Sequence, residues 1–352
     1  MGRQSKLQSA IAELPPAYFS MVMATGSVSL SSHLLGFWFI AMPLLWLNVV
    51  LYVSLWMLTL ARMLLYPQRF FADLSDHIHG VGFFTMVAGT CILGSQFIIM
   101  VQAYKVAIAL LIIGTTLWTV VIYSVFTAFI IRTIKPPLET GISGLWLVSV
   151  VATQSVSILS GLAALYFTRQ HEVILFFSLS MFLLAGMLYL LIIMLIFYRF
   201  MFFPIMPEAL RPPYWINMGA VAISTLSGAL LTLNDSEFQL LKELIPFIKG
   251  FTLLFWATAT WWIPLLLLLG VWRHLVRRVK FTYDPQYWSL VFPLGVYTAC
   301  TVFVARATGL EFLLEIPRYF VFAAQLAWSL TFIGWLKSSV RLLLSATDAS
   351  TK

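Results

Sequence analysis

Long apolar stretches follow one another through this chain with only short polar segments between them. Ten of them reach the roughly 20 residues that a helix needs to cross about 30 Å of hydrocarbon. A barrel strand would alternate apolar and polar residues, whereas Leu190–Ile196 is a continuous apolar run. We therefore predict an all-α integral membrane protein of ten transmembrane helices. The predicted spans are 17–35, 38–61, 80–101, 106–131, 141–163, 173–198, 214–233, 245–272, 286–305 and 318–337.

Composition supports the same class. Of the 352 residues, 61% are hydrophobic and 10% are charged, which is too little polar surface to cover a water-soluble globule of this size. No linker or long polar insertion divides the spans, so we expect one membrane domain at 15–341 between short cytoplasmic tails at 1–14 and 342–352. Cys91 and Cys300 both fall inside spans, and a disulfide framework is not expected.

Lysine and arginine predict the orientation. With the N-terminus inside, 15 of the 21 basic residues lie on the cytoplasmic side, as the positive-inside rule requires. The net charge of +8 then reflects topology and attraction to membrane lipid, and we exclude a nucleic-acid partner. We expect a bacterial-type inner membrane protein with both termini cytoplasmic.

The odd-numbered spans differ from the even-numbered ones. Gly, Ser and Thr supply 33 of 104 residues in the odd spans but only 19 of 124 in the even spans. Small residues let helices approach closely and can line a water-filled path, whereas bulky apolar helices suit contact with lipid. We expect the odd spans to be internal.

An internal repeat agrees with this division. In each odd span an aromatic residue is followed seven positions later by a small one, and successive pairs lie 63 to 73 residues apart. Interfacial aromatic belts could produce part of this pattern. The repeat predicts five similar helical hairpins, with five inner helices around a central pore. The pairs are Tyr18/Thr25, Phe83/Thr90, Trp146/Thr153, Trp215/Ala222 and Trp288/Gly295.

Helix-breaking residues occur near the middle of the odd spans. Kinked helices can expose backbone toward a cavity, and tolerated glycines at packing contacts explain any single position equally well. The predicted kink positions are Gly26, Gly89, Gly94, Gly228, Pro293 and Gly295.

No ionisable residue falls in the middle of an odd span, although proton-coupled carriers normally keep one at membrane depth. Hydroxyl and amide groups without fixed acids favour anions, which cytoplasmic arginine and lysine would concentrate at the mouth. Singly, each of these groups also fits a hydrogen-bonded helix side chain. The candidate liners are Thr25, Ser27, Thr90, Gln96, Thr153, Gln154, Ser155, Ser224, Ser227 and Thr298.

Asp73, Asp76, His77 and His79 are the one cluster with metal-ligand residue types, but their spacing suits a solvated helix start better than an enclosed site. We expect no metal, no cofactor and no catalytic site. A membrane-embedded enzyme would need a convergent polar cluster at membrane depth, and the sequence offers none.

Three segments resemble the tellurite-resistance/dicarboxylate transporter family: Pro15–Gly26 its first span, Gly82–Gly94 its third and Tyr287–Thr301 its ninth. This family includes bacterial TehA channels, plant guard-cell slow anion channels, fungal malate permeases and sulfite exporters. The resemblance implies five hairpins around a pore and a homotrimer with one pore in each subunit. It also implies that Phe292, in the run Phe292-Pro293-Leu294-Gly295, occludes the pore.

Function stays open between two kinds of transport. One is a gated channel for small anions. The other is a carrier or exporter of four-carbon dicarboxylates such as malate, or of sulfite. A tellurite-resistance protein of the same family belongs with this second alternative. The absence of ionisable residues from the odd spans favours the channel.

Overall fold

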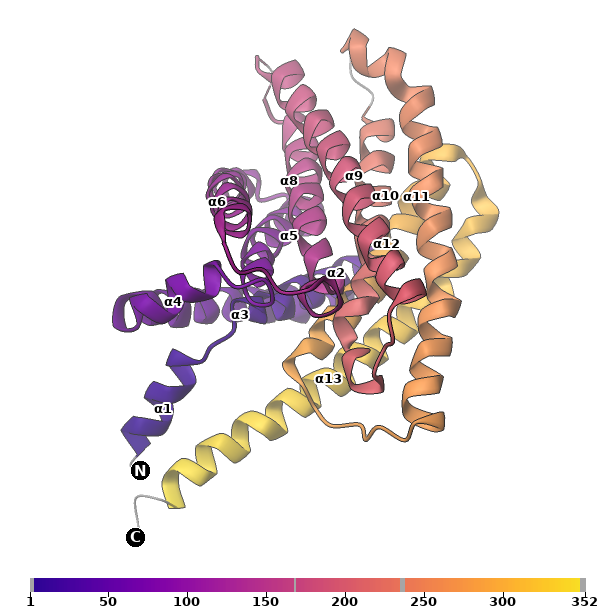
Figure 1. Cartoon of the computed structure of the whole chain (residues 1–352). Coiled ribbons are helices and arrows are strands. Elements are labelled where there is room, and N and C mark those ends of the chain that lie inside the picture. The colour runs from indigo at the N-terminus through magenta and orange to yellow at the C-terminus, as the bar shows by residue number, and fades with distance from the viewer. Residues whose placement is uncertain (1–2, 168, 235–237, 349–352) are drawn as a thin grey trace.

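The computed structural model describes residues 3–167, 169–234 and 238–348. Over these residues the regular structure is entirely helical (Figure 1). Helices satisfy their backbone groups within one segment, which is what a lipid environment demands. The all-α prediction is confirmed, and the described residues contain nine helices that are long and apolar enough to cross a membrane.

Two kinds of long helix alternate along the chain. The shorter kind comprises α2 (Ser20–Leu34), α5 (Phe84–Val101), α8 (Val148–Ala164), α10 (Ile216–Leu233) and α12 (Trp288–Thr308). The longer kind comprises α3 (Trp38–Leu65), α6 (Tyr104–Ile131), α9 (His171–Phe202), α11 (Gln239–Val271) and α13 (Glu315–Asp348). For α5, α8, α10 and α12, 83 to 89% of the most apolar window is buried, against 17 to 39% for the longer helices. The shorter helices are therefore the inner ones.

The first predicted span, 17–35, is not among the nine long apolar helices. Its helix, α2, has 15 residues and contains Ser20, Ser27, Ser29, Ser31 and Ser32. All five serines are buried inside the protein, together with eight other residues of the helix. Because neighbouring helices shield α2, it does not need the apolar surface that a lipid-facing span requires.

The inner helices form a closed ring. α2 packs against α5, α5 against α8, α8 against α10, α10 against α12, and α12 returns to α2. Each inner helix also packs against the longer helix that follows it in the chain, so the five longer helices surround the ring. The packed pairs are α2/α3, α5/α6, α8/α9, α10/α11 and α12/α13. Figure 1 shows the last of these, α13, running past the indigo N-terminal part of the chain.

Every inner helix begins with a short 3-10 turn. These turns are η1 (Pro16–Phe19), η2 (Gly80–Phe83), η3 (Gly144–Leu147), η5 (Pro212–Trp215) and η7 (Pro285–Tyr287). Proline suits the first helical position because its missing N–H would have no partner there. The turns contact one another in the same circular order as the helices, so the five inner helices all start at one end of the ring.

Glycine permits one of these turn contacts. A Cβ atom on Gly144 would lie 2.2 Å from the backbone oxygen of Pro213, so η3 and η5 meet backbone to backbone.

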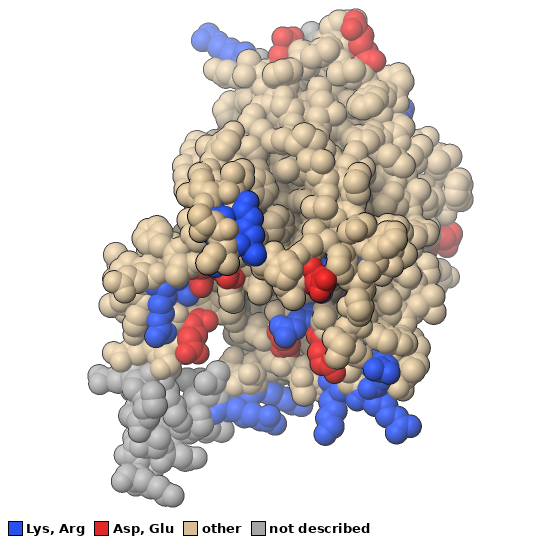
Figure 2. Space-filling view, in the orientation of Figure 1, with Lys and Arg blue, Asp and Glu red and all other residues tan. Residues whose placement is uncertain are grey.

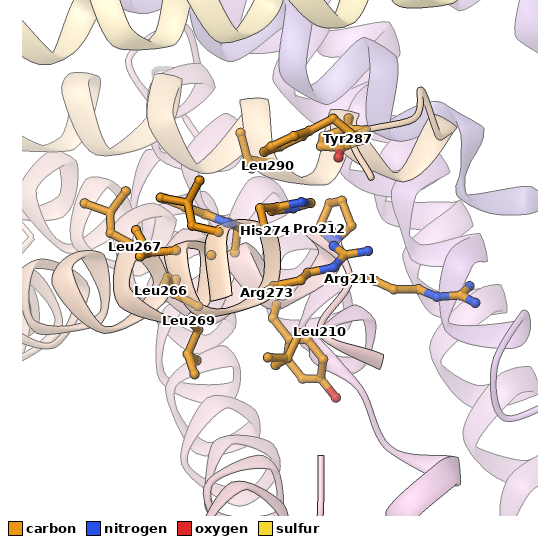
Figure 3. Close-up of a pocket in the computed structure, with 16 residues that line it drawn as sticks. Leu210, Arg211, Pro212, Leu266, Leu267, Leu269, Arg273, His274, Tyr287 and Leu290 are labelled. Carbon is orange, nitrogen blue, oxygen red and sulfur yellow. The ribbon is translucent and has the colours of Figure 1, made fainter. Parts of the chain in front are cut away.

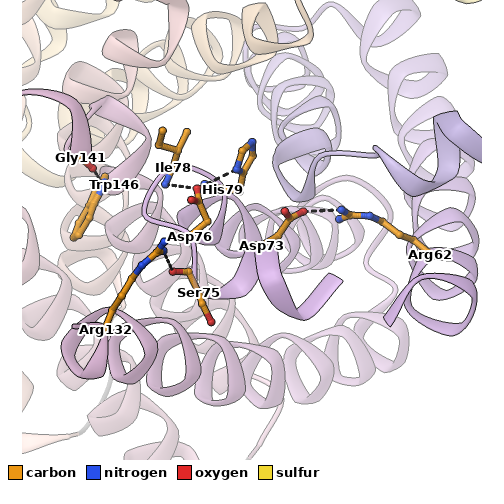
Figure 4. Close-up of polar contacts among 9 residues, drawn as sticks. All are labelled: Arg62, Asp73, Ser75, Asp76, Ile78, His79, Arg132, Gly141 and Trp146. Atoms are coloured by element: carbon orange, nitrogen blue, oxygen red, sulfur yellow. Dashed lines mark hydrogen bonds and ion pairs between the residues drawn. The ribbon is translucent and has the colours of Figure 1, made fainter. Parts of the chain in front are cut away.

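Shorter helices gather at this end as well. They are α1 (Arg3–Ala12), α4 (Pro67–Leu74) and α7 (Leu138–Gly141), together with the 3-10 turn η4 (Pro207–Ala209) and the π-helical turn η6 (Trp272–Val276). The 3-10 turn η8 (Glu311–Leu314) lies at the other end, between α12 and α13. Most of the predicted N-terminal tail is thus helical, while residues 1–2 and 349–352 of the two tails lie outside the described residues. Arg62 binds α1 to α4, since its Nε donates to the carbonyl of Ala12 over 3.1 Å and its Nη2 lies 2.6 Å from Asp73 (Figure 4).

Charged side chains are unevenly distributed over the visible surface. Figure 2 shows a broad uncharged surface, with most Lys and Arg in the lower half of the view and a few charges at the top. The segment after α11 contributes Arg277, Arg278 and Lys280, all exposed. A broad uncharged surface with most basic side chains toward one end is expected of a multi-pass membrane protein.

Candidate functional site

A narrow cavity lies inside the inner ring, and all five inner helices line it. Its volume is about 30 Å³, close to the space that one water molecule occupies in the liquid. Each helix contributes one face, as the spacing of Ser27, Leu30 and Leu34 on α2 illustrates. The other lining residues are Ile92, Ser95 and Ile99; Ser155 and Ile158; Ile223, Leu226 and Leu230; and Phe292, Val296, Ala299 and Phe303.

Phe292 is the residue of the cavity lining that lies nearest the start of its helix. Its side chain is 1% exposed, and it lies one helical turn before Val296, the next lining residue on α12. Gly219 on α10 leaves room for it, because a Cβ there would lie 2.7 Å from Cγ of Pro293 and 3.4 Å from the Phe292 ring. α12 continues through Pro293, so the aromatic ring is held by packing on a regular helix.

Three serines are the polar residues of the lining, and all of them donate their proton to helix carbonyls. Ser27 Oγ donates to Ala24 over 2.9 Å and to the carbonyl of Phe292 over 3.3 Å. Ser95 and Ser155 donate to carbonyls four residues back, over 3.0 and 2.8 Å. The remaining lining is apolar. In this state the cavity offers an ion neither space nor a free hydroxyl proton from its described lining.

Thr25, Thr90 and Thr153 lie elsewhere on the same helices. Each accepts a hydrogen bond from an aromatic side chain of a longer helix: Trp328 over 3.1 Å, Tyr52 over 3.0 Å and Trp118 over 2.8 Å. These three threonines are not in the lining of the narrow cavity. Ser27, Ile92 and Ser155, two positions further on, line the cavity instead. Two residues turn a helix by about 200°, so the repeat marks the outward face.

These bonds join consecutive repeats. Tyr52 on α3 reaches α5, Trp118 on α6 reaches α8, and Trp328 on α13 returns to α2. Trp256 on α11 bonds Thr301 on α12 over 3.1 Å in the same way. In α10 the repeat position is Ala222, which has no hydroxyl to accept such a bond. We call the four bonds the aromatic latches.

The remaining predicted polar liners do not line the cavity, and all of them except Thr298 bond to another helix. Gln154 Nε2 donates to Ser224 over 3.1 Å and to the carbonyl of Phe182 over 3.3 Å. Ser227 bonds Ser157 over 2.8 Å, and Thr298 donates to the carbonyl of Leu294 over 2.9 Å. Gln96 accepts from Asn48 on α3 over 2.7 Å.

The glycines predicted as kinks lie at close helix contacts. Cβ atoms on Gly26, Gly94 and Gly228 would lie 2.6 Å from Ile92, 2.6 Å from Leu159 and 2.1 Å from Thr252. Gly89 faces Val22 at 3.3 Å, and Gly295 faces Ser27 at 2.5 Å. The helices that carry them are continuous, so these residues permit close packing of the ring.

A second cavity, of about 250 Å³, lies where the inner helices begin. η1 and η7 line it together with residues before or within the other three turns, including Ile78, His79, Leu145 and Arg211. Asp284 also faces it, but its carboxylate accepts the backbone N–H of Gln286 over 2.8 Å. We call it the entrance cavity.

The loop before η2 holds the four candidate metal ligands, and Figure 4 shows how its acids are engaged. Asp73 faces Arg62, whereas Asp76 accepts the backbone N–H groups of Ile78 and His79, both over 2.9 Å. Burial raises the pKa of Asp76, but these N–H groups and the His79 ring lower it more, and the pKa falls below its ordinary value. Burial lowers the pKa of His77, and the nearby Arg132 lowers it further.

Comparison with known proteins decides the family. The model of the voltage-dependent anion channel family matches residues 13–336, which include the whole inner ring and the cavity. The chain belongs to this family. Membership makes it a multi-pass membrane transporter of anions, in agreement with the resemblance seen in its first, third and ninth spans.

Relatives of this anion channel family member come from archaea and bacteria. An uncharacterized transporter of Methanocaldococcus jannaschii is 25% identical over 349 residues, which are 96% of each chain. A second one from the same organism is 25% identical over 315 residues, or 86% of each chain. An uncharacterized membrane protein of Mycobacterium tuberculosis is 34% identical over 139 residues, 39% of this chain and 70% of the relative.

Proposed function

We propose that this protein is a channel for small inorganic anions, which pass along the axis of the inner ring, and that Phe292 is its gate. The observation that supports this proposal is the narrow cavity lined by all five inner helices, with Phe292 as the lining residue nearest the start of its helix. An aromatic ring in an apolar constriction can block a path and can rotate away without remaking backbone bonds.

The sign of the permeant ion follows from the electrostatics of the ring. The five inner helices all start at the entrance cavity, so the positive ends of their dipoles point toward it. Arg211 adds a full positive charge there. The described lining of the narrow cavity contains no carboxylate that would hold a cation. These fields favour anions over cations.

The small size of the narrow cavity supports the proposal that the described state is closed. Burying a Phe side chain stabilises a structure by roughly 1.5–3 kcal/mol, which keeps such a pore mostly shut and lets a modest stimulus open it. The serines would act after opening, because rotation of the Ser27 or Ser155 hydroxyl away from its carbonyl turns a proton toward the axis.

Phe292→Ala tests the gate in proteoliposomes loaded with chloride or nitrate. We expect at least a tenfold rise in anion flux, with an intermediate rise for Phe292→Leu, because the substitution removes a plug while α12 keeps its other contacts. Tyr297→Ala is the matched control. Tyr297 is also 1% exposed and on α12, but its hydroxyl bonds Thr260 on α11 over 2.8 Å. Unchanged flux in a correctly inserted Phe292→Ala protein would refute the gate and favour a carrier of malate or sulfite.

The same proposal includes the setting of the channel. We infer that ten helices cross a bacterial-type inner membrane, with α2 as the tenth span, and that the entrance cavity faces the cytoplasm. Arg199, Arg211 and the basic segment after α11 lie at that end, in accord with the positive-inside rule. We also infer a homotrimer with one pore in each subunit, on the strength of the family resemblance.

A further inference from the structure

A further large cavity lies outside the ring, beside the entrance cavity. It measures about 430 Å³, within the usual range of small-molecule sites, and lies between the end of α11, η5 and the start of α12. Arg211 lines both this cavity and the entrance cavity. Neither the gate nor the path of the proposed channel uses it.

The two ends of this cavity differ in chemistry. Figure 3 shows Leu266, Leu267 and Leu269 of α11 together on one side, with Arg273 reaching toward Pro212 and Tyr287 on the other. His274 lies between them. A ligand that fits must be apolar at one end and negatively charged at the other.

Arg273 is the arginine whose side chain reaches into this cavity, whereas Figure 3 shows the side chain of Arg211 extending away from it. Among the described residues neither Arg211 nor Arg273 is part of a salt bridge, and Nε of Arg273 is buried without a hydrogen-bond partner. Guanidinium groups suit phosphate because their fork of N–H donors matches its oxygens. An unpaired buried donor is costly and gains most from an anionic partner.

The rim of the cavity is apolar and exposed. Leu267 is 53% exposed, and Leu275 and Phe281 are 71% and 73% exposed. The Phe281 ring stacks on His274 with 3.7 Å between ring centroids, which fixes the imidazole at the cavity wall. In a multi-pass membrane protein, an apolar rim beside cationic side chains opens toward acyl chains at the level of the headgroups.

We propose that this cavity binds one anionic phospholipid of the surrounding bilayer. Arg273 binds its phosphate, and the leucine side of α11 receives the start of one acyl chain. The lipid also touches Tyr287 and Leu290, which lead into the Phe292 segment of α12. The site is independent of which anion crosses the membrane.

Native mass spectrometry of the purified protein tests this site with phosphatidylglycerol and phosphatidylcholine as probes. The protein should retain one phosphatidylglycerol per chain and prefer it over phosphatidylcholine. Arg273→Gln should weaken retention about tenfold or more, because it removes charged hydrogen bonds to the phosphate. Arg277→Gln is the control, since Arg277 lies nearby over the Trp272 ring and does not line the cavity.

A second pair of variants tests the acyl-chain side without changing charge. Gly270 lines the cavity, and a Cβ atom added there would meet no atom within 4 Å, so the larger side chain of Gly270→Leu should enter the open space and release the lipid. Gly250 on the same helix has equally open surroundings outside the cavity, and Gly250→Leu should retain it. Equal retention by parent, Arg273→Gln and Gly270→Leu would overturn the proposal. Release of the lipid by inorganic phosphate alone would also overturn it, because that result would indicate a site for free anions. Occupation of the cavity by a second copy of the chain would overturn it too.

Discussion

Gly295 lies at one of the close helix contacts of the ring. A Cβ atom there would lie 2.5 Å from Ser27 Oγ, 2.8 Å from the backbone carbon of Ser27 and 2.9 Å from the backbone nitrogen of Val28. Ordinary contacts begin at 3.4 Å, 0.6 Å beyond that 2.8 Å separation. The serine hydroxyl can rotate, but the backbone of α2 cannot, so Gly295→Ala must push α12 and α2 apart.

Two effects oppose each other in this variant. Alanine favours a helix over glycine by about 1 kcal/mol, whereas overpacking a close contact costs about 1–3 kcal/mol. We expect Gly295→Ala to lower the free energy of unfolding by up to about 2 kcal/mol. Gly250→Ala is the control, because nothing lies within 4 Å of its added Cβ and only the helix gain of about 1 kcal/mol remains.

Equilibrium unfolding of the detergent-solubilised variants in increasing dodecyl sulfate, followed by tryptophan fluorescence, measures both changes. Gly250→Ala should shift the transition to higher denaturant, and Gly295→Ala should shift it to lower denaturant. If Gly295→Ala proves as stable as Gly250→Ala, the close contact between α12 and α2 does not exist in the protein.

Two further predictions concern the aromatic latches and the loop before η2. Trp118→Phe keeps the apolar packing of α6 but removes its 2.8 Å bond to Thr153. It should destabilise the protein by about 0.6–1.7 kcal/mol in the same unfolding assay. Adding Thr153→Val to this variant should destabilise the protein little further, because the bond is already absent. His77 stacks on Phe129, and its pKa in the folded protein is lowered from 6.5. The folded state therefore favours the neutral imidazole, whose contribution to the free energy of unfolding is present above pH 6.5 and is lost as the pH falls below it. His77→Phe should flatten the dependence of the melting temperature on pH between about 7 and 5; an unchanged profile would assign that dependence to other groups.

Much of the fold could be predicted from the sequence because composition and periodicity are local signals. The small-residue bias and the aromatic repeat both identify α5, α8, α10 and α12 as internal. α2 is not among the nine helices that are long and apolar enough to cross a membrane, because its serines are buried between helices and do not face lipid. Its place in the ring follows from the repeat, in which Tyr18 and Thr25 match Phe83 and Thr90.

The lining of the cavity could be predicted only in part. Ser27 and Ser155 were among the candidate liners, but the threonines of the repeat face the longer helices. A hydroxyl on an internal helix fits a path or a bond to a neighbour, and the sequence does not choose between them. The aliphatic liners, such as Ile92 and Leu226, carry no signal in a chain that is apolar throughout.

Contacts between distant segments were beyond the sequence. Trp328 bonds Thr25 across 303 positions and closes the ring, yet neither residue is unusual in its own helix. The cavity that holds Arg211 and Arg273 combines residues 62 positions apart, which the topology alone brings together. Phe292 was singled out through the family resemblance, since nothing local separates it from the other phenylalanines of the chain.

The reversal potential of the Phe292→Ala protein in a planar bilayer tests the central claim most directly. With a tenfold gradient of potassium chloride, an anion-selective path through the ring should carry a current that reverses close to the chloride equilibrium potential, about 59 mV in magnitude. The reversal potential of the same protein should not change when potassium is replaced by a large organic cation. A reversal near the potassium potential, or no current at all, would contradict an anion path closed by Phe292.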